Sequence, residues 1–190
     1  GKRFHNDEGY LLLKALYEKY EQHGFVTTEE EIEENIMKRI EANDPVAMRE
    51  RGIKYYKKGD YSNAFEYYMK AAKLGDVQAH YHLAGCYALG HGIEKDEKKK
   101  VVHLEEAAIG GHDLARYNLG VIEWKNGRHE RAFKHFIIAA KLGDDDSLDA
   151  LKGGFKVGLV SKEDFAAALR GHQSAVDATK SPQREAAEAA

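Results

Sequence analysis

Apolar residues recur along this chain at steps of three and four, the spacing that places them on one face of an α-helix. Two clear stripes lie close together, and their apolar positions are Phe65, Tyr68, Met69 and Ala72, then Ala79, Leu83, Ala84 and Tyr87. Glycine turns at 58–60, 90–92 and 126–128 separate such stripes, because glycine readily adopts the backbone angles that end a helix. The pattern therefore predicts pairs of amphipathic helices joined by turns.

The helix pairs repeat. The segment 71–79 returns at 107–115 and at 139–147, so that 36 residues separate Ala72 from Ala108 and 32 separate Ala108 from Ala140. A second set of small residues keeps the same register, eight positions after Asp44, Asp76 and His112, namely Gly52, Ala84 and Gly120. Small side chains at fixed positions predict close helix packing, and four extra residues around 90–96 explain the longer middle unit.

A single helical pair cannot bury its apolar stripe, whereas stacked pairs form a continuous core. Only Pro45 and Pro182 interrupt helix formation, so we expect an all-α fold: a short α-α superhelix, or solenoid, of helical hairpins. We divide the chain into an N-terminal helical pair acting as a cap (1–43), a repeat region (44–156) and C-terminal capping helices with a frayed tail (157–190). The repeats fall at 44–75, 76–111 and 112–143, with a partial one at 144–156.

The two flanking regions carry their own helix signals. We expect one helix over 6–22 and another from Thr28 to about Ala42, with Ile32, Ile36 and Ile40 on its inner face. After the repeats, Ser161 is placed to cap a helix that runs through Leu169, a second helix follows through Ala178, and a last one begins near Ser181.

Composition excludes several classes of protein. The 190 residues include 29 Lys and Arg against 32 Asp and Glu, a net charge of −3 and an ordinary globular balance. The longest apolar runs have five residues, far short of the roughly 18 needed to cross a bilayer, so we expect no membrane insertion. The lone Cys86 can form no internal disulfide, and no signal peptide is visible, so we expect a reducing, cytoplasmic location.

Candidate catalytic and metal-binding chemistry is thin. His80, His82 and Cys86 form the best local cluster, yet the two histidines point in different directions on a helix and no carboxylate joins them. We find no phosphate-binding glycine loop, no nucleophile elbow and no zinc-protease motif, and Cys86 lies inside a helix, where it is a packing residue. We expect no enzyme, no metal and no cofactor.

At this point the chain resembles a known family. The run 75–84, the residues Gly90, Gly92, Ile93 and Asp96, and the segment 106–112 are similar to the Sel-1-like repeat, a relative of the tetratricopeptide repeat. The resemblance covers about residues 40–156 and is closest in the middle unit, while 55–64 is nearer to a tetratricopeptide hairpin. It implies a right-handed superhelix that binds proteins or peptides without catalysis of its own. Some members carry a disulfide in each repeat, from which this chain departs.

The resemblance also implies a binding surface. In such solenoids the first helix of each hairpin lines the concave side, and four positions around its small residue face the groove. These positions are Arg49, Glu50, Ile53 and Tyr56, then Tyr81, His82, Gly85 and Ala88, then Tyr117, Asn118, Val121 and Trp124.

We expect an extended or helical peptide to lie there, with Tyr81, Tyr117 and Trp124 supplying amphipathic surface and Arg49, His82 and Asn118 polar contacts. Tyr81 and Tyr117 fit the helix core equally well. A protein-binding scaffold or adaptor is therefore the predicted function, with at most weak self-association through the terminal repeats.

The alternative is a helical-repeat protein that binds RNA, because some solenoids of similar period bind one base per repeat. Such proteins need a basic groove, since phosphate contacts dominate their affinity. This chain is net negative and its basic run, 95–100, is a mixed-charge loop, so nucleic acid is the less favoured partner.

Overall fold

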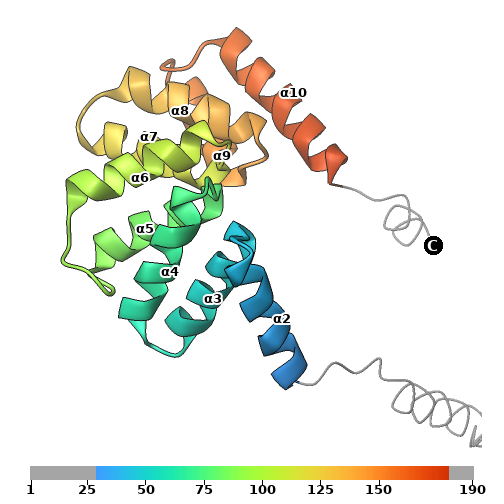
Figure 1. The fold of residues 1–190 in the computed structure, drawn as a ribbon. Coiled ribbons are helices and arrows are strands. Elements are labelled where there is room, and N and C mark those ends of the chain that lie inside the picture. Colours follow the sequence, from blue (N-terminus) through green and yellow to red (C-terminus); the bar gives the residue numbers. More distant parts are fainter. Residues whose placement is uncertain (1–28, 180–190) are drawn as a thin grey trace, which may run out of the picture.

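The computed structural model describes residues 29–179, and within this range the chain forms nine α-helices and no strand. In chain order they are α2 (Glu29–Glu41), α3 (Pro45–Lys57), α4 (Tyr61–Lys73), α5 (Val77–Leu89), α6 (Glu97–Ile109), α7 (Asp113–Lys125), α8 (His129–Lys141), α9 (Asp145–Lys156) and α10 (Lys162–Ala178). They follow one another from α2 at the bottom of Figure 1 to α10 at the top. The prediction of an all-α fold is confirmed.

The helices pack as hairpins. The most extensive contacts join α3 to α4, α5 to α6 and α7 to α8. The second helix of each hairpin then packs against the first helix of the next, α4 on α5, α6 on α7 and α8 on α9. This order of contacts is that of a helical solenoid, as the repeat pattern predicted, and α10 closes the described stack on α8 and α9.

Each first helix begins after a residue that caps its N-terminus, and this residue has the same position in every repeat. Asp44, Asp76 and Asp144 cap α3, α5 and α9, and each carboxylate accepts hydrogen bonds from backbone N–H groups of the first turn. These are donors that a helix cannot satisfy internally. In α7 the same position is His112, whose ring Nδ1 accepts from the N–H of Ala115 at 3.4 Å. A histidine therefore replaces an aspartate as the cap of the third repeat.

The small residues act as the sequence suggested. A Cβ added at Gly52 would lie 2.6 Å from Cε1 of Tyr68, and one added at Gly120 would lie 2.6 Å from Cε1 of Phe136. Both distances are shorter than van der Waals contact, so the two helices of each hairpin can pack this closely only if these positions lack a side chain.

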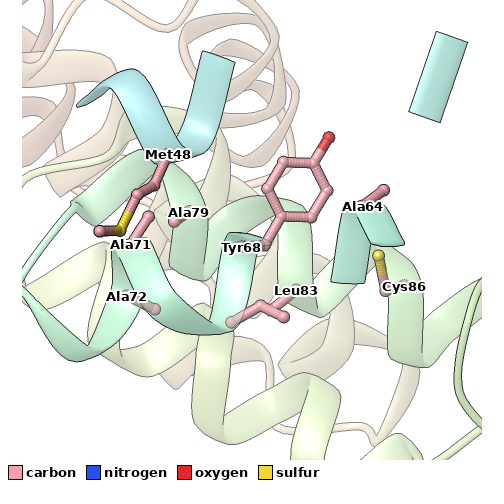
Figure 2. Close-up of a cluster of buried hydrophobic side chains, with 8 residues drawn as sticks. All are labelled: Met48, Ala64, Tyr68, Ala71, Ala72, Ala79, Leu83 and Cys86. Atoms are coloured by element: carbon pink, nitrogen blue, oxygen red, sulfur yellow. The ribbon is translucent and has the colours of Figure 1, made fainter. Parts of the chain in front are cut away.

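The core runs through the stack as three adjoining clusters, each spanning neighbouring hairpins. Figure 2 shows the first of them, in which Tyr68 supplies the only aromatic ring among eight buried side chains from α3, α4 and α5. Cys86 belongs to this cluster and is buried, as predicted.

The ends differ from the sequence-based expectation in two places. The predicted break after Leu169 is wrong: α10 continues from Lys162 to Ala178, capped by Ser161 as expected. Gly171 is a packing position, since a Cβ there would lie 2.6 Å from Cγ of Lys141 on α8. Ile32 is exposed rather than inward. The helices predicted over 6–22 and from Ser181 lie outside the described residues.

The four extra residues of the middle unit fold back on the first hairpin. The loop 90–96 places the ring of His91 flat against Tyr61, with ring centroids 4.0 Å apart. The Tyr56 hydroxyl and His91 Nδ1 are also within hydrogen-bond distance, 2.9 Å. The loop thus joins the second hairpin to the first.

Candidate functional site

A groove crosses the three first helices of the hairpins. It has a volume of about 650 Å³ and is lined by α3, α5 and α7, together with Tyr68 of α4 and two residues of α6. We call it the central groove. Eight of the twelve positions expected to face a groove line it, namely Ile53, Tyr56, Tyr81, His82, Gly85, Ala88, Asn118 and Val121.

A second hollow of about 420 Å³ lies between α7, α8, α9 and the turn that follows α9. We call it the apolar hollow. Tyr117 and Trp124, the other two aromatic positions expected in the groove, line this hollow instead of the central groove. Val121 and Lys125 line both, so the two hollows adjoin along α7.

Arg49 and Glu50 line neither hollow and are engaged within the protein. The guanidinium Nε of Arg49 donates to the carboxylate of Asp76, the cap of α5, at 3.1 Å. Glu50 receives Nη1 of Arg39 at 3.4 Å. Arg49 thus joins the first hairpin to the second, and Glu50 joins α3 to α2. Because both side chains make these internal contacts, they do not line the groove.

The aromatic side chains of the central groove are half-buried and already packed on one side. Tyr81 stacks on His112 with ring centroids 4.2 Å apart. His82 stacks on Tyr68 at 4.7 Å. Tyr56 meets Tyr61 edge to face at 5.1 Å. Tyr81 therefore has both of the roles considered from the sequence: it packs between hairpins and it lines the groove.

In the apolar hollow Trp124 is the more accessible ring, with 42% of its surface exposed. It packs against His129 at 4.2 Å and edge-on against Phe133 at 5.6 Å. Tyr117 is half-buried and meets Phe136 at 5.6 Å, so it too serves packing and lining together. Trp124 therefore offers the larger free aromatic surface.

The charge of the central groove comes from lysines that the sequence argument did not single out. Lys57, Lys100 and Lys125 line the groove, and no carboxylate of residues 29–179 lines it. Lys57 and Lys125 are the last residues of α3 and α7, each five positions after its small residue, Gly52 or Gly120. The repeat register was thus a signal that could have identified them.

Burial keeps the groove histidine neutral. The pKa of His82 is lowered chiefly by burial, then by the positive charge of Arg49, with Asp76 opposing the shift. At neutral pH the cationic character of the groove therefore rests on the lysines.

Among the described residues, the histidines and the cysteine are not grouped as a metal site. Within 29–179 no three His, Cys, Asp or Glu side chains are grouped to hold a metal ion, although His80 and His103 bring their Nδ1 atoms to 3.1 Å. Burial raises the pKa of the Cys86 thiol to about 11, so it is not a ready nucleophile. Among the same residues no helix is both long and apolar enough to span a bilayer.

Fold and site together define a helical-repeat protein with a grooved face. Comparison with known families agrees: the Sel1 repeat model matches residues 47–76, 77–112 and 114–144. This chain belongs to the Sel1 repeat family. Proteins of this family generally mediate protein–protein interactions, and the family is a non-catalytic scaffold family.

Individual relatives match over parts of their length. The chain is 26% identical to DAP3-binding cell death enhancer 1 of mouse over 70% of this chain and 34% of the relative, and 26% identical to its rat counterpart over 82% and 38%. Chitin synthase regulatory factor 4 of Schizosaccharomyces pombe is 33% identical over 45% of this chain and 14% of its own. The chain thus spans little more than a third of these relatives at most.

Two solved structures share the fold. The Sel1 repeat protein of Oxalobacter formigenes superposes with a TM-score of 0.63 at 29% identity, covering 84% of this chain and 69% of that one. The protective antigen c5321 of uropathogenic Escherichia coli gives a TM-score of 0.61 at 24% identity, covering 77% and 33%.

Proposed function

We propose that this chain is a non-catalytic adaptor whose central groove and apolar hollow hold a segment of a partner protein. The observation that carries the proposal is that α7 contributes side chains to both hollows. Asn118, Lys125 and Trp124 point into the two adjoining hollows. The side chains of Asn118 and Lys125 have no hydrogen bond or ion pair with any other described residue. Polar groups left without an internal partner on a concave surface suit an external ligand.

The rigidity of the surrounding structure supports the same function. Tyr56, Tyr81 and His82 are held by stacking or hydrogen bonds to neighbouring helices, so the groove is formed before a ligand arrives. A preformed surface reduces the entropy lost on binding. The mouse and rat relatives are named for binding another protein and the fission-yeast relative for regulating one, which is consistent with an adaptor role for this chain.

The test compares two faces of the protein. A groove variant, Asn118→Ala with Trp124→Ala and Lys125→Ala, alters α7. A matched outer variant, Val102→Ala with Ile109→Ala and Ile138→Ala, removes exposed side chains from α6 and α8. Each is used to capture proteins from a nuclease-treated lysate of its source, after urea unfolding has shown that both are folded.

We expect partners retained by the wild type and the outer variant to be lost from the groove variant. Equal retention by the groove variant would show that the binding surface lies elsewhere. Recovery of RNA alone, without nuclease, would favour the nucleic-acid alternative. The division into caps and repeats, weak self-association through the terminal repeats and a cytoplasmic location stay predictions.

A further inference from the structure

We propose that the segment held by this site is an acidic peptide with one large apolar side chain. Its carboxylates would face the lysines of the central groove and its apolar side chain would enter the apolar hollow. The inference rests on the proposed function and specifies the chemistry of the partner.

The charge of the groove is opposite to that of the protein. The whole chain has a net charge of −3, yet among the described residues three lysines and no carboxylate line the central groove. Lys100 is paired with Glu97, at 2.9 Å. Lys57 and Lys125 have no ion-pair partner among the residues that the structure describes. Two unpaired ammonium groups on α3 and α7 therefore flank the groove and favour a ligand with carboxylates.

The apolar hollow suits a different group. Besides Trp124, its rim includes Val157 and Leu159, which are 71% and 57% exposed, and Phe133 forms part of its wall. Of the residues that the structure describes, Lys125 is the only charged one in its lining. Exposed apolar side chains that lie together around a hollow are typical of a binding site for apolar groups, whereas single scattered ones are not.

The two hollows meet at one residue that can serve both groups. Lys125 lines both, with Val121 beside it one helical turn earlier on α7. A peptide crossing α7 would place an apolar side chain next to Trp124 and a carboxylate near the Lys125 ammonium group. Acidic and apolar residues close together in the sequence of the partner would satisfy both hollows.

The same observations disfavour a single-stranded nucleic acid. Bases bind such proteins by stacking on free aromatic faces. In the central groove one face of Tyr81 is covered by His112, and one face of His82 is covered by Tyr68. The lysines lie on three different helices and are separated by apolar side chains, so they form no continuous track for a phosphate backbone.

The experiment selects peptides and then reverses the groove charge. Random 12-residue peptides displayed on phage are selected on the full chain, and the best one is synthesised with a fluorescent label for anisotropy titration. Three variants are compared: Lys57→Glu with Lys125→Glu, Trp124→Ala, and a control, Lys73→Glu with Lys134→Glu. The control makes the same charge change at exposed lysines of α4 and α8 that have no ion-pair partner among the described residues and line neither hollow.

We expect the selected peptides to be enriched in Asp and Glu and to share one large apolar residue. The groove reversal should weaken peptide binding by about 30-fold or more, because it replaces two attractive charges by two repulsive ones. Trp124→Ala should weaken it by about tenfold, as expected for loss of an aromatic anchor, and the control by less than about twofold. Raising the salt concentration should weaken peptide binding by the wild type but not by the groove-reversal variant.

Other results would overturn the inference in distinguishable ways. Peptides that bind through Trp124 and Asn118 but carry no excess of acidic residues would refute the acidic partner and leave the proposed function standing. Failure to select any peptide would count against both. Tighter binding of a labelled oligouridine, or dimers lost on groove reversal, would assign the groove to RNA or to a second copy of this chain.

Discussion

The boundary between the first and second hairpins and the boundary between the second and third have one geometry and two chemistries. In both, a residue near the start of a first helix reaches the cap of the next first helix. At the first boundary the pair is Arg49 and Asp76, and at the second it is Tyr81 and His112. Because Tyr81 occupies the repeat position of Arg49, and His112 that of Asp76, the two pairs are directly comparable.

The first boundary is held by charge and by an added loop. Asp76 accepts from the N–H of Ala79 at 2.6 Å and from the Arg49 guanidinium at 3.1 Å, so one carboxylate serves as cap and as ion-pair partner. The loop 90–96 adds the contacts of His91 with Tyr56 and Tyr61.

The second boundary depends on a neutral imidazole. His112 is 7% exposed, and its Nδ1 can accept from Ala115 only while that nitrogen carries no proton. Its Nε2 then carries the hydrogen and donates to Oε1 of Gln78 at 3.1 Å. The comparison teaches that one structural position can be filled either by an ion pair or by a neutral histidine stacked on a tyrosine.

The largest effect should come from disturbing the loop that only the first boundary has. Gly92 has φ +76°, and a Cβ there would lie 2.1 Å from the carbonyl oxygen of Tyr61. We expect Gly92→Ala to displace the loop and lower the free energy of unfolding by about 3 kcal/mol. The control is Gly127→Ala in the third hairpin, also at positive φ but with open space around it, which should cost about 1 kcal/mol. Urea unfolding measures both, and equal losses would mean that the loop contacts add no stability.

Removing the charged cap should have the next largest effect. Asp76→Ala deletes the cap of α5 and leaves the partly buried Arg49 without its partner, so we expect a loss of about 2 kcal/mol. Asp60→Ala is the matched control, because Asp60 caps α4 through the N–H of Asn63 and meets no arginine. It should cost about 1 kcal/mol. If both variants lost the same stability by urea unfolding, the pairing with Arg49 would contribute nothing.

Transplanting one pair onto the other boundary tests whether the two are interchangeable. His112→Asp should destabilise the protein, since a buried carboxylate would face Tyr81 instead of an arginine. Adding Tyr81→Arg should recover about 1 kcal/mol in a double-mutant cycle. A coupling energy indistinguishable from zero would show that the second boundary cannot adopt the first boundary's geometry.

Sequence alone could predict what is local and what repeats. The sequence pattern repeats after 32 or 36 residues, and this spacing is enough to predict the helices. It also predicts the small residues Gly52 and Gly120 and the equivalent cap positions Asp76 and His112. The helix break predicted after Leu169 is absent because Gly171 lies inside α10, where its missing side chain lets α10 approach Lys141 of α8.

The candidate site was harder to predict. The family resemblance implied that the first helices line it, and eight of the twelve expected positions line the central groove. That Arg49 turns to Asp76, that His91 folds back 35 residues onto Tyr56 and that Trp124 enters a separate hollow depend on how successive hairpins are rotated. Such contacts are set by tertiary geometry, which no single repeat encodes.

The smallest effect, and the one that separates the two boundaries most directly, is the response to pH. The pKa of His112 is lowered by burial, an effect that the neighbouring Asp113 opposes. A depressed pKa means that the unfolded chain binds the proton more readily than the folded one. The contribution of His112 is therefore present in full above the unfolded pKa of about 6.5, and is lost as the pH falls from there toward the folded value.

We expect the wild type to lose stability between pH 7.5 and pH 5, measured by urea unfolding at a series of pH values. His112→Asn should lose less, because asparagine caps helices well and does not titrate. Part of the loss should remain, since burial also lowers the pKa of His82, His103 and His135. If His112→Asn had the wild-type slope, protonation of His112 would not contribute to the loss, and the contrast between the two boundaries would be one of shape alone.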